Sequence, residues 1–365
     1  MGTGGLLVAA ALAANQGWLD RHFLPLFFFS REKFLLEESL IRLFVGLAGL
    51  GLIFLAGPAA GRLARRMPAR EIVAISLRII LALGLALAAA EFLLAHQFVY
   101  AAAEGPTKEE PIRRPDPLLG WTFLAGRQGQ ATVGGRNIVY TLDKHGYRVR
   151  GTDAPVVTDM PTLVFTGESI MAGYGLSWDE SIPARVGLQL HMQSANMAVF
   201  GYATDQSYLR LKAELPRFRS PVAVVSLFTP ALFVRNLGDD RPYLDASLGW
   251  HPTLHRWRLS SLFRFLIPYH SDVEIERGIQ ATRAVLAATA VLARERHAIA
   301  LVVDPQFGPE EPAERMLRQR ILDVPGISYM RVDLDPAWRL QGDLHPGPRA
   351  AQAIAAAIAQ RLRFH

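Results

Sequence analysis

The chain has 365 residues, of which half are apolar and 20% are charged, and it contains no cysteine. The lack of cysteine excludes disulfide bonds, zinc–thiolate sites, iron–sulfur clusters and a cysteine nucleophile. The net charge of +6 would suit a nucleic-acid partner, but the arginines either gather in one short segment or are scattered. No basic motif is interleaved with aromatic residues, so we expect no nucleic acid among the partners of this protein.

The first 102 residues hold most of the apolar excess, in two stretches that are long enough to cross a membrane. These are residues 40–55, which small residues extend to 61, and residues 72–100. A helix needs about 20 apolar residues to span the bilayer core. The length of the stretches and the arginines between them argue against two buried helices of a soluble domain. We predict a membrane anchor over residues 1–102, with the lipid bilayer as a partner.

The segment between these stretches sets the expected orientation. It holds four arginines within nine residues, at positions 62, 65, 66 and 70, and such clusters mark the cytoplasmic side of a membrane. The second stretch would then run outward from the inner (cytoplasmic) membrane. Everything after residue 102 would lie in the periplasm or outside the cell.

Two features near the N-terminus leave the number of spans open. Residues 5–19 are apolar and are either a short membrane helix or a signal-peptide core. The aromatic run over residues 23–29 is typical of a segment that lies in the membrane interface. Two or three transmembrane helices are therefore expected, and both numbers leave the C-terminal part outside.

Two short regions follow the anchor. Residues 103–117 are polar and rich in proline, which predicts a stiff linker rather than a helix. Residues 118–155 hold four short runs of β-branched and aromatic residues, separated by glycine-containing turns. This pattern is typical of a small β module built as a meander.

Residues 156–365 change to alternating strands and helices. The predicted strands cover residues 162–166, 195–200, 222–228, 298–304 and 328–334, and the predicted helices cover residues 181–192, 207–215, 279–297 and 350–362. This alternation predicts an α/β domain with a parallel sheet and helices on both faces. Sites in such sheets lie beyond the carboxyl ends of the strands, where Ser169, Gly201 and the segment after Phe228 would meet.

Three blocks in this domain carry a resemblance to a known family. They are Gly-Glu-Ser-Ile-Met-Ala-Gly-Tyr-Gly at residues 167–175, Asn-Met-Ala-Val-Phe-Gly-Tyr-Ala-Thr-Asp-Gln at 196–206, and Asp-Leu-His-Pro at 343–346. In this order and spacing they resemble the blocks of the SGNH (GDSL-type) hydrolases, and the approach region at 119–149 resembles membrane-tethered members. The resemblance covers roughly residues 116–365. It implies a flavodoxin-like α/β fold.

The resemblance also implies roles for individual residues. Ser169 would be the nucleophile, which a serine becomes only when a base takes its proton. His345 would be that base and Asp343 would orient its ring. The amides of Ser169 and Gly201 would form the oxyanion hole. The structural alternatives are a helix cap around Glu168 and Ser169, and turns at Asp343, His345 and Gly201.

The sequence departs from the family pattern at two positions. Glu168 stands where the family has an aspartate before the nucleophile, and Ala231 stands where it has an asparagine that donates to the oxyanion. Losing one such donor typically lowers the rate about 10²–10³-fold. Thr229 or a water molecule would have to replace it. Glu168, Tyr202 and Thr229 are therefore candidate residues that line the site.

Two functions remain open on this sequence. The first is a membrane-anchored, extracytoplasmic serine esterase, deacetylase or O-acyltransferase acting on acyl esters, with O-acetyl esters of envelope glycans as the implied substrate class. The second, which Ala231 favours, is a catalytically inactive SGNH-like subunit that binds glycan or packs against other membrane-protein subunits. No cofactor and no metal are expected, since His251 and His255 have Pro252 between them and no phosphate-binding loop is complete.

Overall fold

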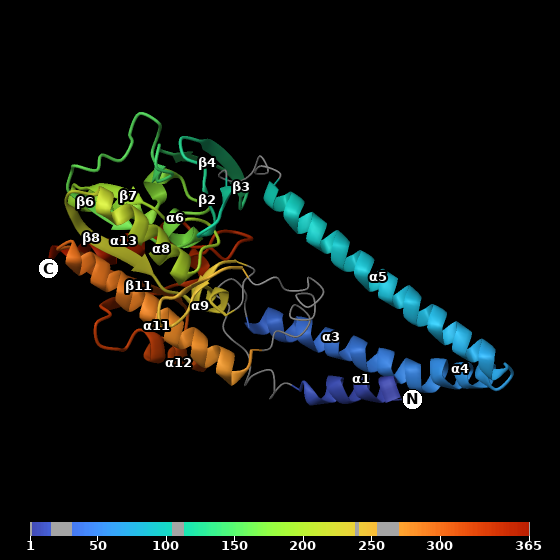
Figure 1. The fold of residues 1–365 in the computed structure, drawn as a ribbon. Coiled ribbons are helices and arrows are strands. Elements are labelled where there is room, and N and C mark those ends of the chain that lie inside the picture. The colour runs from blue at the N-terminus through green and yellow to red at the C-terminus, as the bar shows by residue number, and fades with distance from the viewer. Residues whose placement is uncertain (1, 16–30, 104–112, 238–240, 254–269, 365) are drawn as a thin grey trace. The chain divides into compact units, whose positions relative to one another are not determined.

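The computed structural model describes residues 2–15, 31–103, 113–237, 241–253 and 270–364 (Figure 1). The chain divides into two compact units. One comprises residues 1–23, 29–101 and 255–270, and the other comprises residues 24–28, 102–254 and 271–365. The aromatic run at 23–29 lies outside the described residues. So does most of the predicted linker, at 104–112.

The first unit is made of apolar helices. Their bounds are α1 Gly2–Ala13, α3 Arg31–Gly51, the π-helical turn η1 Leu52–Ala56, α4 Gly57–Ala64 and α5 Ala69–Ala103. Two segments, Leu35–Leu63 and Ala69–Leu94, are long and apolar enough to cross a membrane. Large apolar side chains along both are exposed within the unit, as at Phe44 and Ile80. The two predicted apolar stretches are therefore helices, with the arginine-rich segment between them.

Helix α1 is too short to cross a bilayer alone, because 12 residues rise only about 18 Å. It packs closely against α3 instead. A Cβ built on Gly4 would lie 2.7 Å from the carbonyl oxygen of Gly49, and one built on Gly49 would lie 2.8 Å from that of Gly4. Small residues of this kind let two helix backbones approach in a membrane.

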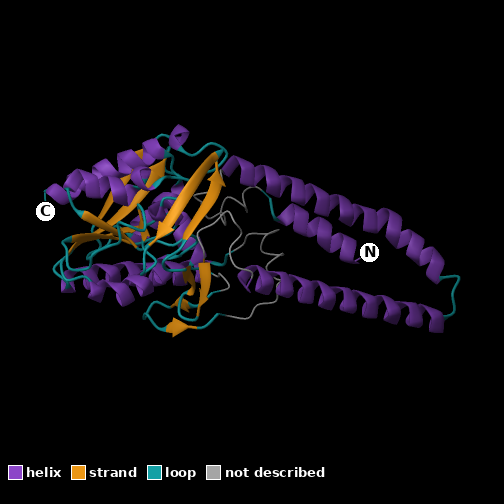
Figure 2. Cartoon of the chain, turned by 90° about the horizontal axis from the view of Figure 1, so that it is seen from above, coloured by secondary structure: helices purple, strands orange, loops and turns teal. Residues whose placement is uncertain are grey.

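The second unit is an α/β domain around an eight-stranded sheet, drawn in orange in Figure 2, with the strand order β12-β11-β8-β6-β7-β5-β4-β3. The strands from β12 to β7 are parallel, and β5, β4 and β3 are antiparallel. Their bounds are β3 Gln128–Val133, β4 Arg136–Leu142, β5 Arg148–Val149, β6 Thr162–Phe165, β7 Gln193–Asn196, β8 Pro221–Leu227, β11 Ile299–Phe307 and β12 Tyr329–Leu334.

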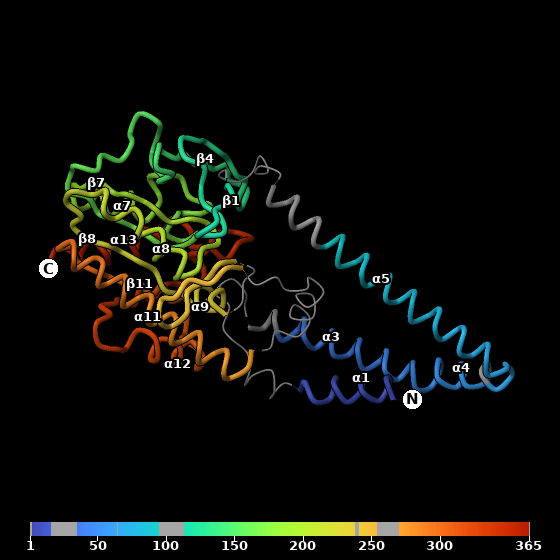
Figure 3. Tube along the Cα trace, viewed as in Figure 1, coloured from blue at the N-terminus to red at the C-terminus, as the bar shows by residue number. Residues whose placement is uncertain are grey.

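Helices cover both faces of the sheet, as expected (Figure 3). On β6, Leu163 and Phe165 join the core that includes α7 and α13, whereas Val164 joins the core on the opposite face with α8 and α11. This alternation follows from the two-residue period of a strand. The helix bounds are α6 Ser169–Ala172, α7 Ile182–Leu190, α8 Thr204–Glu214, α9 Pro230–Arg235, α11 Asp272–Glu295, α12 Pro312–Ile321 and α13 Pro348–Arg363.

The predicted β module is present but is joined to the main sheet. Strands β3, β4 and β5 extend the sheet beyond β7, because Arg148 of β5 pairs with Asn196 of β7. Strands β1 Arg113–Asp116 and β2 Gly120–Phe123 form a separate antiparallel pair. The end of the predicted linker is therefore a strand, and the module and the α/β domain share one sheet.

The five predicted parallel strands are all found, and β11 continues to Phe307, three residues beyond its predicted end. The largest boundary change is in β7. Strand β7 ends at Asn196, whereas the apolar run that predicted it continues to Phe200. The Asn196 side chain explains the early end, since its Oδ1 accepts the amide of Ala198 at 3.2 Å and its Nδ2 donates to the Met171 carbonyl at 3.1 Å. The chain then leaves the sheet toward Gly201.

Strand β11 carries a buried carboxyl group whose pKa links stability to pH. Asp304 is 6% exposed, and burial raises the pKa of its carboxyl to about 7, with Arg331 and Arg318 only partly offsetting this. The ordinary value is 3.8. The folded state therefore holds the neutral acid below about pH 7. The contribution of this group to the free energy of unfolding is complete below the unfolded pKa and is lost as pH rises through about 7.

Replacing Asp304 with asparagine should remove this pH dependence. Between pH 4 and pH 8, the unfolding free energy of the wild-type protein should fall by roughly 2–4 kcal/mol relative to Asp304→Asn, at 1.36 kcal/mol for each pKa unit. Urea unfolding of the detergent-solubilised chain, followed by tryptophan fluorescence, measures both curves. Parallel curves for the two proteins would contradict the assignment.

Candidate active site

Ser169 lies just beyond the carboxyl end of β6, at the first residue of helix α6. Glu168 caps that helix, because its Oε1 accepts the amide of Ile170 at 3.0 Å. The cap function therefore falls to Glu168 and not to Ser169. Ser169 is 5% exposed, and its hydroxyl contacts the side chains of Glu168 and His345.

The hydroxyl of Ser169 meets His345, and His345 meets Asp343. The Oγ of Ser169 is 2.8 Å from His345 Nε2, and the other ring nitrogen, Nδ1, is 2.6 Å from Asp343 Oδ1. The same Asp343 oxygen accepts the backbone amide of His345 at 2.7 Å. The structure thus brings together the hydroxyl, imidazole and carboxylate that the sequence predicted, in the order that proton transfer from a serine requires.

The loop that carries His345 is closed by backbone hydrogen bonds. The amide of Leu340 donates to the His345 carbonyl at 2.8 Å, and the amide of Gly347 donates to the Trp338 carbonyl at 2.7 Å. The ring of Tyr174 lies against the imidazole, with 4.6 Å between ring centroids. These contacts hold the loop and the imidazole in one place.

The charge state of Asp343 suits an orienting role. Its hydrogen bond with His345 lowers the pKa of the carboxyl below the ordinary value, although burial works in the opposite direction. Asp343 is therefore a carboxylate at neutral pH. A carboxylate here favours the imidazole tautomer with the proton on Nδ1, in which Nε2 is a hydrogen-bond acceptor.

Gly201 lies at a tight turn, on the segment that follows the neighbouring strand β7. Its φ is +77°, and a Cβ there would lie 3.3 Å from the ring of Trp121. The indole Nε1 of Trp121 donates to the Phe200 carbonyl at 3.0 Å and fixes the turn. The amide of Val199 donates to the Gly167 carbonyl at 3.2 Å, so the segments bearing Ser169 and Gly201 are joined directly.

The three candidate lining residues differ in what they contact. Glu168 is completely buried, and its Oε2 makes a short hydrogen bond with the Ser169 hydroxyl. That hydroxyl has one proton, so it donates either to Glu168 or to His345 Nε2 and not to both at once. The phenol of Tyr202 donates to the Trp121 carbonyl at 2.8 Å. Thr229 caps α9 by accepting the amide of Leu232 at 3.4 Å. Of the three, Glu168 is the one whose side chain is seen to contact Ser169, while Tyr202 and Thr229 support neighbouring backbone.

Sequence reasoning missed the role of Arg148, which fixes the turn after Ser169. Its guanidinium donates to the carbonyl oxygens of Ala172, Gly173 and Leu176 at 2.6, 2.7 and 2.6 Å and lies 4.5 Å from the ring centroid of Tyr140. Burial lowers the pKa of Arg148 to about 10, so it remains charged at neutral pH. A lone arginine in a strand gives no sequence signal for this contact.

A metal site does not emerge from the part of the chain that the structure describes, where no three His, Asp or Glu side chains gather in a way that could hold an ion. The chemistry available around Ser169 is that of a hydroxyl, an imidazole, two carboxylates and backbone amides. These groups suit acyl transfer through a serine.

No protein-family model matches the sequence, and no curated protein matches it. Among solved structures, the chain is similar to an acetyl xylan esterase from the rumen bacterium Butyrivibrio proteoclasticus, with 12% identity over 57% of this chain and 65% of that one and a TM-score of 0.37. It is also similar to a family two carbohydrate esterase from Clostridium thermocellum, with 12% identity, 58% and 66% coverage and a TM-score of 0.37. A third similar structure is a member of the lipolytic protein G-D-S-L family from Veillonella parvula. It is 10% identical over 55% of this chain and 96% of that one, with a TM-score of 0.35. The chain spans just under two thirds of the length of the first two.

Replacing Arg148 with methionine should destabilise the domain strongly. Three buried carbonyl oxygens would lose their donor, so we expect the unfolding free energy to fall by about 3–5 kcal/mol. Arg150→Met is the matched control, because Arg150 pairs with Asp179 at 2.6 Å on the surface, where such pairs contribute at most about 1 kcal/mol. Equal losses for the two variants in urea unfolding would contradict the role of Arg148.

Proposed function

We propose that this chain is a membrane-anchored serine esterase of SGNH type, with Ser169 as nucleophile, His345 as base and Asp343 as the orienting carboxylate. The observation that carries the proposal is the continuous hydrogen-bonded path from Ser169 Oγ through His345 to Asp343. The path connects the carboxyl end of β6 to the loop after β12. Sites of α/β sheets lie at this edge.

The reaction follows from this geometry. The Oγ of Ser169 attacks the ester carbonyl while its proton moves to His345 Nε2, and the amides of Ser169 and Gly201 donate to the oxyanion that forms. The tetrahedral intermediate collapses, and His345 returns the proton to the departing alcohol. The acyl group is then bonded to Ser169. An attacking hydroxyl, activated by the same imidazole, takes the acyl group and frees the serine.

The acceptor of the acyl group decides the type of enzyme. Water as acceptor makes the protein an esterase or deacetylase, and a sugar hydroxyl makes it an O-acyltransferase. The two apolar helices would anchor the chain in the inner membrane, and the arginines between them would face the cytoplasm. The site would then face the periplasm or exterior, next to envelope glycans. We propose O-acetyl esters of such glycans as substrates, with other membrane-protein subunits as partners in a transferase complex.

A second function, a catalytically inactive SGNH-like subunit, rests on Ala231. This residue is 5% exposed in the first turn of α9, and its methyl group supplies no donor to an oxyanion. In that case the domain would bind glycan or pack within a membrane complex without turnover.

A fluorophosphonate probe distinguishes the two functions. The purified full-length protein should be labelled at Ser169 and should hydrolyse a short chromogenic acetyl ester, and Ser169→Ala should lose both. Asp343→Asn, which favours the wrong imidazole tautomer, should lower kcat by about 10³–10⁴-fold. Folded wild-type protein that neither reacts with the probe nor cleaves the ester would favour the inactive subunit.

The orientation can be tested with single cysteines, since the chain has none of its own. Arg66 and Arg127 are both exposed, one between the two apolar helices and the other in the α/β domain. In intact cells with a permeable outer layer, a membrane-impermeant thiol reagent should label Arg127→Cys and spare Arg66→Cys until the cells are lysed. The reverse pattern would show that the domain faces the cytoplasm.

A further inference from the structure

An arginine lies on the same short helix as the position of the missing oxyanion donor. Ala231 occupies the family's asparagine position, and Arg235 follows it by four residues on the same short helix, α9. Residues four apart lie on the same face of a helix. A long side chain at 235 can therefore reach the space that a shorter amide at 231 would occupy.

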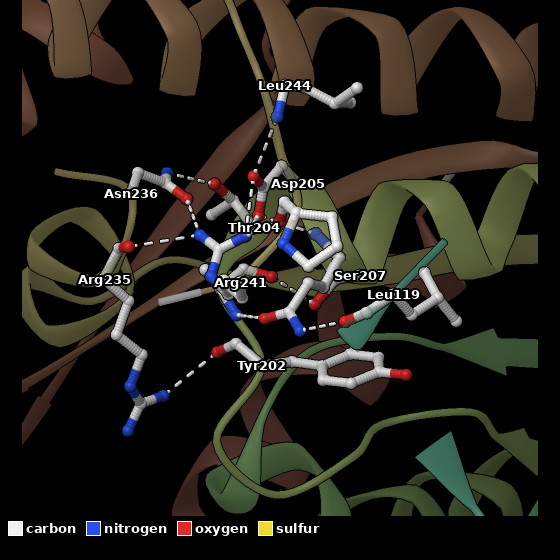
Figure 4. Close-up of polar contacts among 12 residues, drawn as sticks. Leu119, Tyr202, Thr204, Asp205, Ser207, Arg235, Asn236, Arg241 and Leu244 are labelled. Carbon is white, nitrogen blue, oxygen red and sulfur yellow. Dashed lines mark hydrogen bonds and ion pairs between the residues drawn. The ribbon is translucent and has the colours of Figure 1, made fainter. Parts of the chain in front are cut away.

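The guanidinium of Arg235 bridges the two segments that carry the oxyanion amides. Its Nη1 donates to the carbonyl of Tyr202 at 3.0 Å, and Tyr202 directly follows Gly201. The same nitrogen is 3.6 Å from Oε2 of Glu168, which directly precedes Ser169. Figure 4 shows the side chain extended toward the Tyr202 carbonyl. Arg235 remains 23% exposed, so a substrate can approach it.

A buried ion pair fixes the C-terminal end of α9, which carries Arg235. Arg241 and Asp205 pair at 2.8 Å, with exposed side-chain fractions of 2% and 3%. The Nη2 of Arg241 donates to the backbone carbonyl of Arg235 at 3.1 Å and to Oδ1 of Asn236 at 3.3 Å (Figure 4). The end of α9 is thus fixed before substrate binds. A fixed donor needs no reorganisation as charge develops in the transition state.

We propose that Arg235 is the additional oxyanion donor of this site and replaces the side-chain amide absent at Ala231. The inference rests on the proposed esterase function. The oxyanion carries a full negative charge, and hydrogen bonds from a charged donor are roughly twice as strong as those from a neutral one. Glu168 balances the arginine while the site is empty. The Glu168 carboxylate thus contacts both Ser169 and Arg235.

The test compares kcat and KM for a short uncharged acetyl ester, using full-length protein in detergent. Arg235→Met should lower kcat about 10²–10³-fold and leave KM within about threefold, because the donor acts on the transition state and not on the neutral substrate. Adding Ala231→Asn to Arg235→Met should restore at least about tenfold in kcat. Arg217→Met, which removes a half-exposed arginine paired with Glu214 elsewhere in the domain, is the matched control and should leave both constants unchanged.

Three results would overturn the inference. These are an unchanged kcat in Arg235→Met, a rise confined to KM, and a loss of kcat that Ala231→Asn fails to recover. Circular dichroism and thermal melting verify that each variant is folded. If Arg235→Met does not fold, kcat and KM are measured for Arg235→Gln, which keeps a polar side chain, and the same three results would overturn the inference. A wild-type protein that is neither labelled by fluorophosphonate nor active would refute the proposed function itself, whereas an active wild type with a fully active Arg235→Met refutes only the role of Arg235.

Discussion

The hydrogen bond between Ser169 and His345 joins residues 176 positions apart in the chain. It forms only when β6 and β12 lie in the same sheet with their carboxyl ends at one edge. Strands β8 and β11 between them fix this arrangement through their parallel registers. The chemistry of the site therefore depends on the packing of the whole sheet, and the loops supply only the final placement of each group.

The sequence predicted those parts of the fold that depend on local pattern. Apolar runs marked the parallel strands, and the serine and histidine blocks sat where strands end. Contacts between segments that are distant in the sequence could not be predicted in this way. The pairing of Arg148 with Asn196 joined the β module to the sheet, and the Asn196 side chain ended β7 early. Neither contact has a periodic signal, because each depends on one side chain meeting a remote backbone.

The candidate site shows the same division. Ser169, Asp343 and His345 could be found because their spacing resembles a family pattern. Tyr202 and Thr229 were reasonable candidates from their neighbours, but their hydroxyls bond to Trp121 and Leu232. Arg235 follows Ala231 by four residues, and no role could be assigned to it from the sequence. Only the folded turn of α9 and the buried Arg241–Asp205 pair place it beside Glu168.

The continuity of β3, β4 and β5 with the sheet has a practical consequence for anyone preparing a soluble fragment. A chain cut at residue 156, where the sequence suggests a domain boundary, would lack β5, one of the two strands that pair with β7. The exposed edge of β7 could then pair with a strand of another molecule. It would also discard Arg148, which donates hydrogen bonds to the turn after Ser169. A fragment meant to stay monodisperse should begin before Arg113, so that β1 and everything after it is retained.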